Sequence, residues 1–228
     1  MIPLFTKIIR RKSFSRDQAN SVKEIIHARE VRESRTHSKR REIPFVVKYF
    51  REPIEKVRGW EAISRDLVSI GVPAAKLTQV KETSIGVYAK QKDYSNSLQT
   101  QLHNAREFGK LTSDLAIKIV LDMAKMHKRG YVLSAHEHIF APWIIYKKPN
   151  GESDRVIVDY GSVIKHDSPK FIVNGKERSH AEQNISTLLP SLVIFDKKTR
   201  IKIMETYFSI NPDPTLKSTA STFMEHHF

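Results

Sequence analysis

The stretch MHKRGYVLSAHEHIFAPWIIYKKPNGESDRVIVDYG, residues 126–161, decides the fold. It opens on the end of a helix, because a glycine such as Gly130 commonly stops a helix. A short loop follows, and then two apolar segments, 143–147 and 155–158, lie on either side of Asn150-Gly151. Asn-Gly between apolar segments is typical of a tight β-turn, so the two segments are predicted to form a hairpin.

The composition is that of a globular protein with room for one large domain or two small lobes. The 228 residues are 39% hydrophobic and 28% charged, and none is cysteine, so no disulfide or thiolate chemistry is expected. No apolar run approaches the ~20 residues that span a bilayer, and the apolar start, residues 1–5, is too short for a signal peptide. We expect a cytoplasmic protein without a transmembrane segment; a secreted effector or association with a membrane surface fits as well.

The net charge of +14 is concentrated near the N-terminus. Residues 1–41 contain 12 Lys/Arg and 4 Asp/Glu, so +8 of the charge lies there. Such a segment attracts acidic partners: an anionic glycan, a lipid surface, a nucleic acid or an acidic protein. The alternative is a solvated basic face that serves only solubility.

The first part of the chain is predicted to be a small β-rich lobe with one helix. Residues 24–27 and 28–32 are compatible with a hairpin, and residues 45–50, which are β-branched and aromatic, predict a strand. Residues 54–70 carry apolar side chains at helical spacing and end at Gly-Val-Pro, which predicts a helix. Two further strands are expected, at 77–80 and 84–90.

The second part is predicted to be mostly helical. Its helices are expected at 97–108, 111–128, 179–193 and 197–208, with the hairpin between the second and the third. The tail from Asn211 is polar and contains two prolines, which predicts a loosely held end. The expected domains are a basic N-terminal segment 1–41, an N-lobe 42–96, a C-lobe 97–210 and the tail 211–228.

Four short motifs follow one another along the chain: Lys48-Tyr49-Phe50-Arg51, Trp60-Glu61-Ala62, Ile70–Lys76 and Met126–Gly130. Their order resembles the lysine strand, helix glutamate, connector and helix end of the small atypical bacterial kinases. Within that group the likeness is to the lipopolysaccharide-core sugar kinases and the Rio-like kinases, and it spans residues 45–208. The resemblance implies an α+β, bilobal protein-kinase-like fold with a small β-rich N-lobe and a helical C-lobe.

The resemblance also implies a site for ATP and Mg²⁺. Lys48 would contact the α- and β-phosphates, and Glu61 would pair with Lys48; the alternative is a Lys48 that points to solvent from the polar face of its strand. Asp159 follows an apolar strand and precedes Tyr160-Gly161, where kinases have D-F-G. It would therefore hold Mg²⁺; the alternative is an ordinary aspartate between a strand and a turn.

The loop before the hairpin lacks two chemical groups of a kinase. The kinase loop reads H-R-D-x-x-x-x-N, and aligning its first histidine with His136 places His138 on the catalytic aspartate and Trp143 on the metal-binding asparagine. His138 can accept a proton, and a shift of one residue would make Glu137 the acid, but an indole offers a metal no oxygen. Because no glycine precedes Gly59, a glycine-rich phosphate loop is absent too.

The sequence therefore predicts a kinase-like protein, either a pseudokinase or a highly atypical ATP-dependent phosphotransferase. One alternative is an active small kinase that uses His138 or Glu137 on a sugar phosphate, a lipopolysaccharide or a protein. Another is a non-enzymatic adaptor for an acidic partner. A zinc hydrolase is disfavoured, because His136 and His138 lack the i, i+4 spacing of HExxH.

Overall fold

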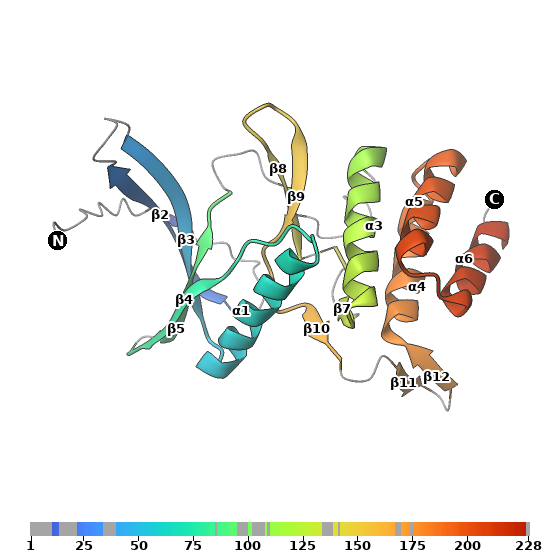
Figure 1. Ribbon diagram of the computed structural model, residues 1–228, viewed down its shortest axis with the longest axis horizontal. Coiled ribbons are helices and arrows are strands. Elements are labelled where there is room, and N and C mark those ends of the chain that lie inside the picture. Colours follow the sequence, from blue (N-terminus) through green and yellow to red (C-terminus); the bar gives the residue numbers. More distant parts are fainter. Residues whose placement is uncertain are drawn as a thin grey trace. The chain divides into compact units, whose positions relative to one another are not determined.

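The fold is mixed α+β and divides into two compact units (Figure 1). The computed structural model describes residues 11–13, 22–33, 40–84, 86–94, 100–101, 108, 110–133, 139–140, 142–166, 170–173 and 176–226. Unit 1 comprises Met1–Asp66 and Ala75–Leu98, and unit 2 comprises Leu67–Ala74 and Gln99–Phe228. The chain therefore enters unit 2 briefly at 67–74 before it returns to complete unit 1.

Unit 1 is built on an antiparallel sheet in the order β1-β2-β3-β5-β4. The strands are β1 (Arg11–Ser13), β2 (Val22–Glu33), β3 (Arg40–Phe50), β4 (Thr78–Thr83) and β5 (Gly86–Lys92). The pairing of β3 with β5 is regular from Phe45↔Lys92 to Phe50↔Val87. Since successive side chains of a strand point to opposite faces, this register fixes the face on which each β3 side chain lies.

Helix α1 (Ile54–Ser69) packs against this sheet in unit 1. Val57, Trp60 and Ser64 are buried at helical spacing, and the Trp60 ring lies 5.4 Å from the Phe50 ring of β3, centroid to centroid. The Ser64 side chain also satisfies a backbone amide, because its Oγ accepts a hydrogen bond of 3.1 Å from the amide of Leu77. The ring contact between Trp60 and Phe50 orients one face of α1 toward β3, the strand that contains Lys48.

Unit 2 contains the helices α3 (Ser113–Lys128), α4 (His180–Leu192), α5 (Lys197–Ile210) and α6 (Pro214–His226). Helix α3 packs on α5, and α4 packs on α6. Side-chain oxygens cap three of these helices at their N-termini, where Thr112, Ser179 and Asp196 each accept from an amide of the first turn. Each of these caps satisfies one amide that has no partner within the helix.

Short antiparallel sheets complete unit 2. One has the order β6-β8-β9, the second pairs β7 with β10, and the third pairs β11 with β12. Their strands are β6 (Thr100–Gln101), β7 (Tyr131–Leu133), β8 (Trp143–Lys147), β9 (Ser153–Ile157), β10 (Val163–Lys165), β11 (Lys170–Val173) and β12 (Lys176–Ser179). In the part of the chain that the structure describes, no helix has the length and apolar character needed to cross a bilayer.

Several elements confirm the sequence-based expectations. The predicted helices at 54–70, 111–128, 179–193 and 197–208 correspond to α1, α3, α4 and α5. The hairpin at Asn150-Gly151 is also present, since β8 pairs with β9 and Lys148 N donates to Glu152 O over 2.8 Å. Gly151 has a φ of +83°, a backbone conformation that glycine adopts without strain.

Other expectations were wrong. Residues 24–32 do not turn back as a hairpin but belong to one strand, β2, which pairs with β3. The helix expected at 97–108 is contradicted at Thr100–Gln101, which form strand β6, and most of its remaining positions lie outside the described residues. In place of a loosely held tail after Asn211, the chain forms α6, in which Leu216 and Ala220 are buried.

Candidate functional site

Lys48 lies in the middle of β3, between Ile25 of β2 and Ala89 of β5. Its side chain is half-buried. Because Lys48 and Phe50 are two residues apart in a regular pairing, both side chains lie on the same face of the sheet, the face on which Phe50 contacts Trp60 of α1. The face that contacts α1 therefore carries Lys48 beside buried neighbours such as Ala89.

Glu61 follows Trp60 on α1 and is also half-buried. It lies one turn after Val57 and one turn before Ser64, both of which are buried, and its carbonyl oxygen accepts a 2.7 Å hydrogen bond from Ser64 Oγ. Lys48 and Glu61 thus both belong to unit 1, Lys48 on the sheet face that it shares with Phe50 and Glu61 between buried residues of α1. A lysine ammonium attracts an anionic ligand, whereas a carboxylate can contribute only by pairing with that lysine.

Asp159 belongs to unit 2, directly after β9. Its Oδ1 accepts a 3.0 Å hydrogen bond from the amide of Gly161, which closes an Asx turn. The chain just before it is anchored, because Pro142 O accepts from the amides of Val158 (2.9 Å) and Asp159 (3.5 Å). The carboxylate is therefore held at the end of a hairpin whose backbone is fixed by hydrogen bonds.

Trp143 begins β8 and pairs with Ile157 of β9. The side chain is fully buried, and its indole Nε1–H has no hydrogen-bond acceptor among the residues that the structure describes. An indole enclosed in this way fills a core position. The metal-binding role that a kinase gives to the aligned asparagine is therefore chemically unavailable at Trp143.

The catalytic candidates Glu137 and His138 fall in residues 134–138, outside the described residues, as does His136. Within the described ranges no group of three or more His, Asp or Glu side chains is arranged to hold a metal ion. The structure thus places Lys48 on β3 and Glu61 on α1, both in unit 1, and holds Asp159 beside the β8–β9 hairpin of unit 2.

A buried polar network that sequence reasoning missed lies directly before this loop. His127 Nδ1 lies 2.6 Å from Tyr207 Oη, and His127 Nε2 lies 3.0 Å from Asn184 Oδ1. Asn184 also bonds both backbone groups of Leu133, since Oδ1 accepts from its amide and Nδ2 donates to its carbonyl, each over 2.9 Å. The network ties α3, α4 and α5 to β7, the strand that leads into residues 134–138.

The partners of His127 define its tautomer. Asn184 Oδ1 can only accept, so Nε2 carries the proton and Nδ1 accepts from the Tyr207 hydroxyl. Burial lowers the pKa of His127 from 6.5 to about 4, while the hydrogen bond with Asn184 acts in the opposite direction. His127 is therefore neutral at physiological pH and serves as a structural group.

A second cluster that the sequence analysis did not predict consists of charged side chains from α3 and from the β8–β9 hairpin. The Arg155 guanidinium of β9 makes a bidentate pair with Asp122 of α3, with Nε–Oδ2 and Nη2–Oδ1 distances of 2.9 Å. Arg155 also contacts Asp154 over 3.1 Å, and Asp154 pairs with Lys148 over 2.8 Å. Burial raises the pKa of Asp122 to about 6 against the opposing effect of Arg155, so the carboxyl is ionised and paired at neutral pH.

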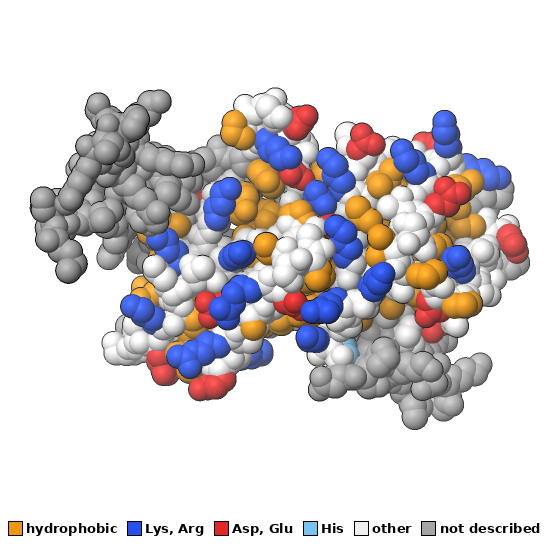
Figure 2. All heavy atoms as spheres, viewed as in Figure 1, with side chains coloured by type: hydrophobic (Ala, Val, Ile, Leu, Met, Phe, Trp, Pro, Cys, Tyr) orange, Lys and Arg blue, Asp and Glu red, His pale blue; other side chains and the backbone are white. Residues whose placement is uncertain are grey.

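Basic side chains are prominent on the surface of the protein. Figure 2 shows lysine and arginine side chains scattered among hydrophobic ones on the face that it draws. This distribution agrees with the excess of basic residues in the sequence.

Comparison of the sequence with models of protein families, and with curated proteins, finds no match.

Proposed function

We propose that this protein is a kinase-like nucleotide-binding protein with incomplete phosphotransfer machinery, that is, a pseudokinase or a highly atypical phosphotransferase. Lys48 contacts the phosphates of ATP, Glu61 pairs with Lys48, and Asp159 binds the accompanying Mg²⁺. The ATP phosphates supply the negative charge that Lys48 recognises, and Mg²⁺ supplies the positive charge that Asp159 binds.

The position of Lys48 is the observation that carries the proposal. It lies on the third strand of the sheet, on the face that contacts the following helix, and that helix carries Glu61 next to Trp60. Protein kinases use a lysine on the third strand and a glutamate on the following helix in the same way. Lys48 is half-buried beside buried residues such as Ala89, a position in which its ammonium requires polar or anionic partners.

The burial of Trp143 supports binding over catalysis. A fully buried indole at the position aligned with the metal-binding asparagine leaves only Asp159 among the described kinase-like metal ligands. We therefore favour a pseudokinase over an active small kinase that would use His138 or Glu137.

The test is a thermal-shift titration of the full chain with ATP, with and without Mg²⁺. ATP at 100 times its Kd stabilises a protein by about 2.7 kcal/mol, which raises the Tm of a chain of this size by roughly 5–10 °C. Lys48→Ala is expected to reduce this shift strongly. Asp159→Asn preserves an acceptor for the Gly161 amide but lacks the negative charge, so it is expected to remove only the Mg²⁺-dependent part.

The matched control is Lys90→Ala. Lys90 pairs with Val47 and lies over the Phe45 ring, so it occupies the opposite face of the same sheet. This variant is expected to keep the ATP-dependent shift. A wild-type chain that shows no shift with ATP under either condition would refute the proposed function.

A further inference from the structure

Exposed aliphatic side chains gather where α4 ends and α5 begins. Among the described residues, four large hydrophobic side chains are exposed, and three of them fall between positions 193 and 201. The exposed fractions are 49% for Val193, 57% for Ile194 and 40% for Ile201. A single exposed aliphatic residue needs no explanation, but three in one short segment indicate a contact surface.

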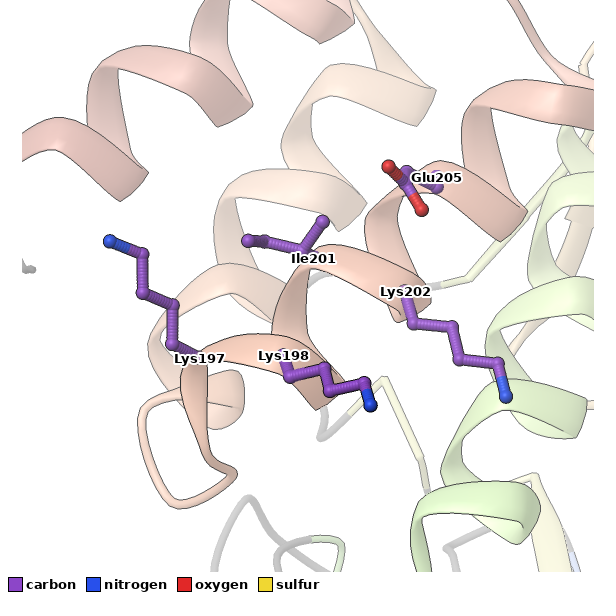
Figure 3. Close-up of a pocket in the computed structure, with 5 residues that line it drawn as sticks. All are labelled: Lys197, Lys198, Ile201, Lys202 and Glu205. Carbon is purple, nitrogen blue, oxygen red and sulfur yellow. The ribbon is translucent and has the colours of Figure 1, made fainter.

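Helix α5 has two faces of different character. Ile203, Met204 and Tyr207 are buried within unit 2. The opposite face carries Lys197, Lys198, Ile201, Lys202 and Glu205, as Figure 3 shows. We group these residues with Val193 and Ile194, which are exposed in the turn before α5, and call the seven residues the basic-apolar face.

The lysines surround the aliphatic side chain at the centre of α5. In Figure 3, Lys198 and Lys202 extend to one side of the helix, whereas Lys197 extends to the other side of Ile201. The α5 residues of the face are three lysines and Glu205, and the exposed Asp196 just before them adds a second carboxylate, so a positive charge of one remains. The charge of the face is therefore complementary to an anionic surface, and the aliphatic groups give that surface an apolar contact.

We propose that the basic-apolar face docks on an anionic phospholipid bilayer. The aliphatic side chains of Val193, Ile194 and Ile201 enter the boundary between headgroups and acyl chains, while the lysine ammonium groups reach the lipid phosphates. This docking is independent of nucleotide binding.

The shape and chemistry of the face favour a bilayer over other anionic partners. A nucleic acid offers phosphates but no apolar phase for three aliphatic side chains at a helix start. Among the residues that the structure describes, those that line this surface all come from α5. A fluid lipid surface adapts to such a single helix and its preceding turn.

Cosedimentation of the full chain with vesicles tests the proposal. The probe vesicles contain phosphatidylglycerol and phosphatidylcholine, and pure phosphatidylcholine vesicles are the comparison. Each basic residue at an anionic membrane contributes about a fivefold gain in partitioning. The variant K197Q/K198Q/K202Q is therefore expected to bind the anionic vesicles on the order of 100-fold more weakly, and V193S/I194S at least about tenfold more weakly because it loses most of the apolar contact.

A matched variant separates this face from general basic charge. K81Q/K128Q/K147Q removes the same charge from three exposed lysines on other elements and is expected to bind like the wild type. In addition, the emission of I194W is expected to shift to the blue when anionic vesicles are added, because the indole enters the bilayer boundary. Equal loss in both lysine variants, undiminished binding of V193S/I194S, no blue shift of I194W, or no wild-type binding to anionic vesicles would each overturn the proposal.

Discussion

Asp122 and His127 lie on the same helix, α3, and both are buried, yet they are stabilised in different ways. Asp122 is charged at neutral pH and depends on a bidentate partner, Arg155, from β9. His127 is neutral, and each of its ring nitrogens has one uncharged partner, Tyr207 or Asn184. A buried charge is thus tolerated through pairing, whereas a buried titratable ring is tolerated because it stays uncharged.

The difference determines what each cluster loses when a partner is removed. Without its partner, a buried ion keeps its full desolvation cost, which makes broken ion pairs expensive. A neutral group without its partner loses only hydrogen bonds, at about 1–3 kcal/mol for each buried polar group left unpaired.

The largest expected effect is that of Asp122→Ala. It leaves the Arg155 guanidinium, whose side chain is 12% exposed, with Asp154 as its remaining carboxylate partner, and is expected to lower the free energy of unfolding by about 3 kcal/mol. Urea denaturation followed by far-ultraviolet circular dichroism measures the loss. The double variant D122L/R155M replaces both charges with apolar groups and is expected to recover most of it; a single variant as stable as the wild type would show that the pair contributes nothing.

Asn184→Leu is expected to have the next largest effect, a loss of about 2–3 kcal/mol in the same measurement. The change leaves the amide and carbonyl of Leu133 unpaired and removes the acceptor of His127 Nε2. Asn211→Ala is the matched control, because Asn211 is only half-buried and its Nδ2 donates to the Tyr207 hydroxyl over 3.1 Å. It is expected to cost about 1 kcal/mol; equal losses in the two variants would contradict the role of Asn184.

The smallest expected effect is the pH dependence of the free energy of unfolding, to which His127 and Asp122 contribute with opposite signs. Unfolded His127 binds a proton below pH 6.5 but the native ring only near pH 4, so acid destabilises the native state through His127. Native Asp122 takes up a proton near pH 6 but the unfolded side chain only near 3.8, so acid stabilises the native state through Asp122.

Two variants separate these contributions. Between pH 7 and pH 5, His127→Gln is expected to lose about 2 kcal/mol less stability than the wild type, and Asp122→Asn to lose about 1 kcal/mol more. Urea denaturation at both pH values measures the two differences. Parallel behaviour of the variants and the wild type would mean that neither group has a shifted pKa.

Local patterns were enough to predict much of the fold. Helix α3 follows from apolar spacing and a stop at Gly130, with Thr112 and Ser113 as possible caps of which the structure uses Thr112, and the β8–β9 turn follows from Asn150-Gly151. Those signals act within a few residues, so they appear directly in the sequence. The position of Lys48 on a strand was predictable for the same reason, since its neighbours are β-branched and aromatic.

The errors and omissions arise where the deciding contact is distant or the residue has two roles. Pro214 suggested an irregular tail, but it is the first residue of α6, a position where proline is favourable, and Asp213 Oδ1 accepts from the amides of Thr215 and Leu216. His127 and Asn184 are far apart in sequence and carry no local pattern that pairs them. The loop residues Glu137 and His138 remain predictions, because they lie outside the described residues.

The segment Leu67–Ala74 has a consequence for dividing the protein into fragments. It lies between two parts of unit 1 in the sequence but belongs to unit 2, where Pro73 O accepts from Ile157 N over 2.9 Å and Gly71 O accepts from Lys125 Nζ over 3.0 Å. A fragment that starts at Gln99 would lack these partners and leave Ile157, at the end of β9, without one of its backbone bonds. During synthesis, residues 67–74 leave the ribosome before unit 1 is complete. They cannot form their contacts with Lys125 and Ile157 until α3 and β9 have also been synthesised.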